Sequence, residues 1–126
     1  MMDAGKKKIL ICDDEPLIRE AISYAVKKAG HEFVMAEDGL QAYDMVKAEA
    51  PDLVLLDVGM PGMSGFDVCK KIREMPGGEK YQIMIITAFG QASDQDKAIS
   101  AGANDYLSKP FSPRDLIVKL ETIFSR

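Results

Sequence analysis

Carboxylate, hydroxyl and ammonium side chains follow the apolar runs of this sequence, each at the point where a run ends. They are Asp13, Asp14, Asp57, Thr87 and Lys109. Carboxylates without histidine or cysteine beside them are hard oxygen ligands, the donors that Mg²⁺ prefers. A carboxylate close to such a cation, an ammonium and a hydroxyl is equipped to attack a phosphoryl group and to neutralise the anion that forms. These residue types therefore indicate phosphoryl-transfer chemistry, provided that the fold brings them together.

Asp57 ends the run Leu53–Leu56, four aliphatic residues without polar alternation. Such a run is typical of a strand buried on both faces of a parallel sheet. Turn residues from Gly59 to Gly65 follow, so the Asp57 carboxylate is expected at the rim of the sheet, where open α/β sheets place their sites. A single aspartate there could simply cap the turn. The other polar strand ends favour a site, because parallel strands all end at the same rim.

Apolar runs and amphipathic segments alternate five times along the chain. Strands are predicted over 9–12, 33–36, 53–57, 83–87 and 105–108, the second of them at an edge. Helices are predicted over 16–29, 39–50, 66–75, 94–101 and 113–124, with Leu40, Tyr43 and Val46 facing inward from the second. This alternation predicts an α/β fold, a doubly wound five-stranded parallel sheet flanked by five helices.

Length and composition narrow the classes of function. The 126 residues fit one domain, spanning 1–126. The net charge of -4, with acids and bases interspersed, argues against direct binding to nucleic acid, and no apolar stretch approaches the roughly 18 residues of a membrane span. No signal peptide is visible, so a cytoplasmic location is expected. Cys12 and Cys69 are expected to be reduced, buried thiols, and His31 a surface or strand-edge histidine without a ligand role.

Five segments carry a resemblance to a known family. They are residues 9–16, 55–65, 85–89, 101–106 and 109–111, which read ILICDDEP, LLDVGMPGMSG, IITAF, AGANDY and KPF. They follow one another in order over nearly the whole chain, and the sequence resembles the receiver domains of two-component response regulators, of the single-domain, chemotaxis-regulator-like kind. The resemblance implies a flavodoxin-like sheet in the order 2-1-3-4-5, with the first and third strands side by side.

The resemblance also implies a chemical role for each acidic residue. Asp57 would accept a phosphoryl group from a sensor histidine kinase or a phosphotransfer protein. Asp14, an oxygen of Asp57 and the backbone carbonyl of Gly59 would bind Mg²⁺ directly, and Asp13 would help through water. By this resemblance the protein is not an enzyme, beyond assisting its own phosphorylation and dephosphorylation.

A switch is implied by the remaining residues. Thr87 and Lys109 would bind the phosphoryl oxygens, and Tyr106 would turn inward as Thr87 moves; the alternative for Tyr106 is a half-exposed strand aromatic. The Lys109–Pro110 peptide is expected to be cis. The switched face would bind a downstream protein or a covalently linked output domain, and a phosphorylation-dependent dimer is left open.

Two positions depart from the family pattern. Gly59 has no side chain where many members carry a larger or polar residue, and Phe89 is apolar where some carry an acid or amide. Neither position can orient an attacking water, so a long-lived phosphorylated state is predicted.

Three other classes of protein compete for the same residues. A flavin- or nucleotide-binding domain needs a Gly- or Ser/Thr-rich phosphate cradle after the first strand, where this chain has Asp13, Asp14 and Glu15. An aspartyl-nucleophile phosphatase of the haloacid dehalogenase type would have its nucleophile after the first strand and a second acid two residues on, but Gly59 occupies that place after Asp57. A phosphorylation-independent docking module is disfavoured because the full set of polar strand-end residues is present.

Overall fold

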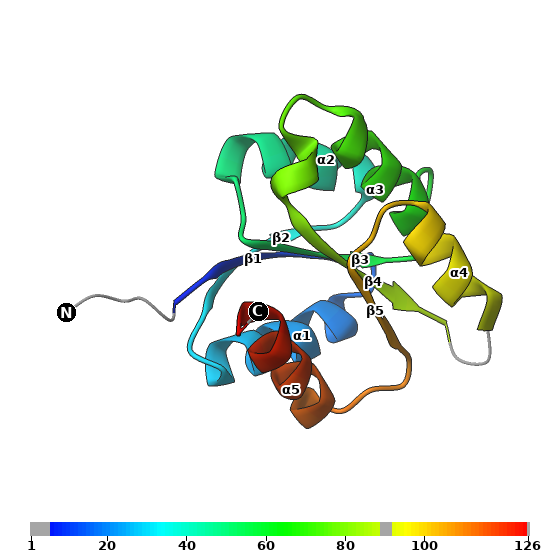
Figure 1. The fold of residues 1–126 in the computed structure, drawn as a ribbon. Helices are drawn as coiled ribbons and strands as arrows, with labels where there is room; N and C mark the ends of the chain where they lie inside the picture. Colours follow the sequence, from blue (N-terminus) through cyan, green and yellow to red (C-terminus); the bar gives the residue numbers. More distant parts are fainter. Residues whose placement is uncertain (1–5, 89–91, 126) are drawn as a thin grey trace.

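The described residues of the computed structural model, 6–88 and 92–125, form a five-stranded parallel sheet with helices on both faces (Figure 1). The strands are β1 (Lys8–Cys12), β2 (Glu32–Ala36), β3 (Leu53–Asp57), β4 (Gln82–Thr87) and β5 (Asp105–Ser108). The helices are α1 (Pro16–Lys28), α2 (Gly39–Glu49), α3 (Gly65–Glu74), the short 3₁₀ helix η1 (Gly78–Lys80), α4 (Ala92–Ser100) and α5 (Pro113–Phe124). The sheet order β2-β1-β3-β4-β5 confirms the predicted doubly wound, flavodoxin-like fold, with β2 at an edge.

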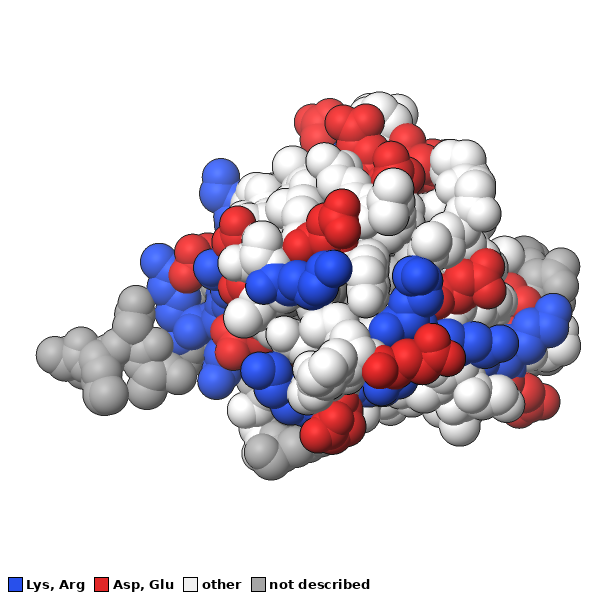
Figure 2. Space-filling view, turned by 90° about the horizontal axis from the view of Figure 1, so that it is seen from above, with Lys and Arg blue, Asp and Glu red and all other residues white. Residues whose placement is uncertain are grey.

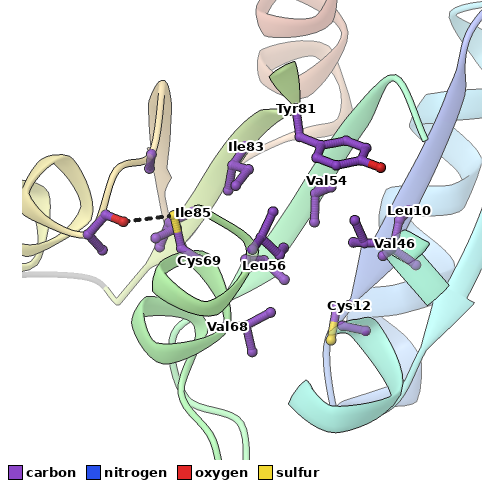
Figure 3. Close-up of a cluster of buried hydrophobic side chains, with 14 of the residues drawn as sticks. Leu10, Cys12, Val46, Val54, Leu56, Val68, Cys69, Tyr81, Ile83 and Ile85 are labelled. Atoms are coloured by element: carbon purple, nitrogen blue, oxygen red, sulfur yellow. Dashed lines mark hydrogen bonds between the residues drawn. The ribbon is translucent and has the colours of Figure 1, made fainter. Parts of the chain in front are cut away.

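The helices form two layers around the sheet. In Figure 1, α1 and α5 lie below the sheet, and α2, α3 and α4 lie above it. The side chains of each central strand alternate between these layers. Ile9 and Ile11 of β1 belong to the buried cluster between the sheet and helices α1 and α5, whereas Leu10 and Cys12 belong to the cluster between the sheet and the other three helices. Figure 3 shows the second cluster. Because both faces are buried, the central strands are apolar except at their end residues.

Local capping signals set where several helices begin. Asp38 accepts a hydrogen bond from the backbone N–H of Gln41 at the start of α2. Ser64 and Ser112 form reciprocal capping boxes at the starts of α3 and α5. These caps satisfy backbone N–H groups that a helix leaves without partners, and they fix where the chain turns after each strand.

The prediction for Leu40 is wrong: its side chain is 61% exposed. The buried stripe of α2 consists of Gly39, Ala42 and Val46, with Tyr43 half-buried beside it. This stripe follows the helical spacing i, i+3, i+4 and i+7, and Leu40 falls one residue outside it, on the solvent side.

Cys12, Cys69 and His31, for which the sequence indicated no chemical role, have structural contacts. Cys12 and Cys69 are free and buried, as predicted, and Cys69 donates a hydrogen bond to the Ala101 carbonyl (Figure 3). His31 lies just before the edge strand β2, where its Nδ1 accepts from the Lys7 backbone N–H. Within the described part of the chain, the helices are too short or too polar to cross a bilayer. On the face shown in Figure 2, acidic and basic side chains are interspersed.

Candidate functional site

Three predicted carboxylates meet at the carboxyl ends of β1 and β3. Asp13 and Asp14 follow β1, Asp57 ends β3, and each offers an oxygen within 4.8 Å of the others. Asp13 is completely buried and Asp57 is 4% exposed, whereas Asp14 is open to solvent. The cluster therefore combines two buried carboxylates with one that solvent reaches.

The loop after β1 is held in place by its own backbone. The Asp13 N–H donates to the Ala36 carbonyl and continues the pairing of β1 with β2. One Asp13 oxygen accepts from the Glu15 N–H at 2.9 Å, and the Arg19 guanidinium donates to the Asp13 carbonyl at 2.7 Å. These contacts turn the chain from β1 into α1 and leave the second Asp13 oxygen, Oδ2, 3.8 Å from Lys109 Nζ.

The loop after β3 is held just as closely to Asp57. The Val58 N–H donates to the Ile86 carbonyl, and the Gly65 N–H donates to the Val58 carbonyl. The Gly59 N–H lies 3.1 Å from Asp57 Oδ2 and donates to it. These bonds fix the direction of the Asp57 carboxylate and place Gly59 next to it.

Lys109 supplies the cation of the site. Its Nζ lies 2.8 Å from Asp57 Oδ1, 3.8 Å from Asp13 Oδ2 and 3.5 Å from Glu15 Oε1. The Lys109 N–H donates to the Thr87 carbonyl at 2.9 Å, which continues the β4–β5 pairing, and the Lys109–Pro110 peptide is cis, as predicted. One ammonium thus balances a group of acids that carries more negative charge than it can offset.

The electrostatics of the site follow from this imbalance. Burial raises the pKa of Asp13 to about 6, and the negative charge of Asp57 adds to the effect, while the Glu15 N–H and Lys109 oppose it. Burial alone would lower the pKa of the Lys109 ammonium. The hydrogen bond and charge of Asp57, with the charges of Asp13 and Glu15, outweigh burial, so the Lys109 pKa is raised.

The carboxylates fit a hard divalent cation. Asp13 Oδ2 is buried and has no hydrogen-bond partner among the described residues, an arrangement that costs free energy unless another positive group approaches. The donors of the cluster are all oxygens, which favours Mg²⁺ over softer metals. The predicted metal residues Asp13, Asp14 and Asp57 therefore lie together, with Gly59 adjacent to them.

Thr87 ends β4 at the same rim, and its hydroxyl is hydrogen-bonded to β5. Its side chain is fully buried, and its Oγ1 lies 3.0 Å from the Ser108 Oγ. Tyr106 is half-buried on β5 and packs against the cluster under α4, with the Lys119 ammonium 5.9 Å from its ring centroid. Phe89 lies outside the described residues.

Comparison with known proteins assigns this arrangement to a family. A model of the response regulator receiver domain matches residues 9–121. The chain belongs to the response regulator receiver domain family. It is thus a receiver domain of two-component signalling, a module that carries signals.

Individual relatives agree with this assignment. The phosphate regulon transcriptional regulatory protein PhoB of Pseudomonas aeruginosa is 38% identical over 120 residues, which are 95% of this chain and 52% of PhoB. The chain thus spans about half the length of the curated relatives it matches. A protein of Chloroflexus aurantiacus assigned as a response regulator has a TM-score of 0.91 at 34% identity, covering 96% of this chain and 99% of that one.

One solved relative was crystallised with a metal. The receiver domain of a sensor histidine kinase from Pseudomonas aeruginosa has a TM-score of 0.87 at 27% identity, covering 96% of this chain and 99% of that chain. Its structure holds a magnesium ion coordinated in the active site cleft. In this chain, the acidic cluster lies at the carboxyl ends of strands β1 and β3.

Two residues of the receiver site were not predicted from the sequence. Glu15 is expected from the sequence only as part of the acidic turn before the first helix, although its carboxylate lies 3.5 Å from Lys109 Nζ. Ser108 had no predicted role, although it is the hydrogen-bond partner of Thr87. Glu15 could have been suspected because it directly follows Asp13 and Asp14, but the contact of Ser108 depends on the β4–β5 register, which the sequence does not display.

Proposed function

We propose that Asp57 is the phosphoacceptor of this receiver domain and that residues 1–126 form one domain around it. The observation that carries the proposal is the 2.8 Å contact between Asp57 Oδ1 and Lys109 Nζ, inside a group of three carboxylates. A nearly buried carboxylate beside an ammonium has the nucleophile and the counter-charge that phosphoryl transfer requires.

The transfer would use a phosphohistidine of a sensor histidine kinase or phosphotransfer protein. An oxygen of Asp57 attacks the phosphorus, a P–O bond forms, the P–N bond breaks, and the electron pair leaves with the imidazole. Lys109 stays close enough to pair with the phosphoryl oxygens, and the Gly59 N–H keeps the carboxylate oriented during the attack.

Asp13, Asp14 and Asp57, with the Gly59 carbonyl, would hold Mg²⁺, Asp13 acting through water. A bound Mg²⁺ would neutralise the charge of the phosphoryl oxygens as they approach the carboxylates. The Asp13 oxygen that lacks a hydrogen-bond partner supports this assignment, as does the magnesium ion in the related receiver domain.

The output would follow from movement of Thr87 toward the phosphoryl group. Tyr106 would fill the space that Thr87 leaves and so change the face formed by α4, β5 and α5. That face would bind a downstream protein, a second copy of the phosphorylated domain or a linked output domain. The last is supported by the length of the curated relatives, such as PhoB, about half of which the chain spans. We place these events in the cytoplasm.

The proposal is tested by phosphorylation with acetyl phosphate, followed by intact-mass measurement. The wild type should gain one phosphoryl group with Mg²⁺ and none with EDTA. Asp57→Asn should gain none, whereas Asp44→Asn, an exposed change on α2, should match the wild type. Persistent uptake by Asp57→Asn would refute the assignment. A wild type that takes up nothing would support the docking-module alternative, and continuous release of phosphate at many turnovers would support a phosphatase.

A further inference from the structure

The Thr87 and Ser108 hydroxyls form a hydrogen bond of 3.0 Å across strands β4 and β5. We propose that Ser108 is a positioning residue that retains the Thr87 hydroxyl in the unphosphorylated state and so sets how readily the domain switches. The proposal rests on the switching role proposed above for Thr87. It adds a residue that opposes the switch and that can be varied without touching the phosphoacceptor or its cation.

The β-sheet register makes this contact specific. Thr87 and Ser108 are direct partners in the parallel pairing of β4 with β5. The side chain of Thr87 follows Ile83 and Ile85 on the face covered by α4, and Ser108 follows Tyr106 on the same face, because strand side chains alternate. The bond from the Lys109 N–H to the Thr87 carbonyl, 2.9 Å long, holds the two strand ends in this register.

Because Thr87 is buried, its hydroxyl depends on Ser108 for a hydrogen bond. Its side chain is fully buried, and the Ser108 hydroxyl is its hydrogen-bond partner within residues 6–88 and 92–125. A buried hydroxyl without a partner is unfavourable, so Thr87 leaves Ser108 only when another hydrogen-bond partner, such as a phosphoryl oxygen, is offered. Ser108 is only half-buried, so water can replace Thr87 as its partner.

The same strand end also carries the cation of the site. Ser108 is followed directly by Lys109, whose Nζ contacts Asp57. Two adjacent residues therefore contact the two functional groups: Lys109 contacts Asp57, and Ser108 contacts the Thr87 hydroxyl. Removing the Ser108 hydroxyl leaves Lys109 in place but removes the bond that favours the unphosphorylated arrangement of Thr87.

The size of the effect follows from the strength of one hydrogen bond. Loss of a neutral hydrogen bond changes a conformational equilibrium about fivefold. We therefore expect Ser108→Ala to raise the population of the switched arrangement about fivefold before phosphorylation. Ser108→Thr keeps a hydroxyl at the same position and should restore the behaviour of the wild type.

The experiment compares wild type, Ser108→Ala and Ser108→Thr by amide NMR, with and without acetyl phosphate and Mg²⁺. Without phosphodonor, the Tyr106 and α4 resonances of Ser108→Ala should lie part of the way toward those of the phosphorylated wild type, and Ser108→Thr should overlay the wild type. In a Thr87→Val background, Ser108→Ala should add no further shift, because the hydroxyl that it releases is absent.

The outcomes separate this proposal from the proposed function. If the wild type is phosphorylated on Asp57 but Ser108→Ala leaves the resonances unmoved, or Ser108→Thr behaves like Ser108→Ala, Ser108 has no positioning role. A shift that persists in the Thr87→Val background would also overturn it, because the effect would then be a general loosening of β5. If the wild type takes up no phosphoryl group, the proposed function fails and this inference fails with it.

Discussion

Gly65 packs directly against the backbone of Asp57. A Cβ at Gly65 would lie 2.5 Å from the Asp57 carbonyl oxygen and 3.0 Å from its carbonyl carbon, distances that backbone atoms cannot tolerate. Gly65→Ala should therefore push the start of α3 away from β3 and displace the phosphoacceptor, destabilising the fold by about 2–3 kcal/mol. Urea unfolding measures the loss of stability, and acetyl phosphate uptake should fall with it.

Gly59 provides the matched control. A Cβ there would meet only Asp57 Oδ2, at 3.6 Å, which is ordinary contact. The free energy of unfolding of Gly59→Ala should therefore lie within about 0.5 kcal/mol of that of the wild type. Equal losses for the two alanine variants would show that the close approach at Gly65 does not limit the position of α3.

Lys109→Met should destabilise the protein in a pH-dependent way. The change keeps the apolar stem of the side chain but leaves Asp13 and Asp57, both nearly buried, without their cation. Buried charges without a partner are strongly unfavourable when ionised and much less so when protonated. Urea unfolding with EDTA should therefore show a larger loss at pH 7.5 than at pH 4.5. A loss that is equal at both pH values would mean that Lys109 contributes packing alone.

Asp13→Asn should stabilise the metal-free protein at neutral pH. The pKa of Asp13 in the folded state, about 6, lies above its ordinary value of 3.8, so between these values the folded state binds more protons than the unfolded chain. The Asp13 contribution to stability therefore falls as the pH rises through this range and stays low above it. In EDTA, the free energy of unfolding of Asp13→Asn should exceed that of the wild type by about 1–2 kcal/mol at pH 7.5 and by little at pH 4.

Added Mg²⁺ should make the wild type more stable than Asp13→Asn, the reverse of the order expected in EDTA. Mg²⁺ bound at the proposed site should raise the unfolding midpoint of the wild type at pH 7.5, with a smaller effect at pH 5, where Asp13 is mostly protonated. Asp13→Asn should respond less than the wild type at both pH values. A midpoint of the wild type that does not move with Mg²⁺ would contradict the proposed metal site.

The sequence predicted the fold class well because apolar runs and amphipathic segments alternate without ambiguity. The sheet order came from the family resemblance, since the apolar pattern of a strand does not say which strand lies beside it. Leu40 was misassigned because one residue separates the buried stripe of α2 from its exposed side. A short helix gives few turns from which to fix that boundary.

The sequence predicted which residues lie at the strand ends of the candidate site, but not all the contacts between their side chains. Asp13, Asp57 and Lys109 meet because parallel strands finish at one rim, which is a property of the fold class. The partner of the Thr87 hydroxyl is set by the β4–β5 register, to which Ser108 belongs. The register results from packing on both faces of the sheet, so it could be read only from the structure.

Arg73 should contribute strongly to stability although it lies outside the site. Its guanidinium donates to the Gly102, Gly78 and Tyr81 carbonyls and to Asn104 Oδ1, each at 2.8 Å. These bonds fasten the end of α3 to the segments that enter β4 and β5. Arg73→Ala removes all four hydrogen bonds, including those to the Gly102 and Tyr81 carbonyls, and should cost about 2–3 kcal/mol.

Lys70→Ala is the control for Arg73→Ala, because Lys70 is an exposed cation on the same helix. Its free energy of unfolding, measured in urea, should lie within about 0.5 kcal/mol of that of the wild type. Both variants should still take up one phosphoryl group from acetyl phosphate at low temperature, since neither residue touches the acidic cluster. A similar cost for both variants would show that the hydrogen bonds of Arg73 are replaced by water without loss.

The phosphorylated state should be long-lived, and a polar side chain at Gly59 should shorten it. Hydrolysis needs a water held in line with the aspartyl phosphate, and a nearby polar group is required to orient it. Gly59 is exposed, adjoins Asp57 and has room for a Cβ, so Gly59→Asn can place an amide beside the phosphoryl group without displacing the loop. Loss of phosphate, followed by intact mass after removal of acetyl phosphate, should be severalfold faster in Gly59→Asn than in the wild type, with Gly59→Ala unchanged. The same loss measured for Phe89→Glu tests the second departure from the family pattern, and an unchanged lifetime in both polar variants would mean that neither position controls access of the water.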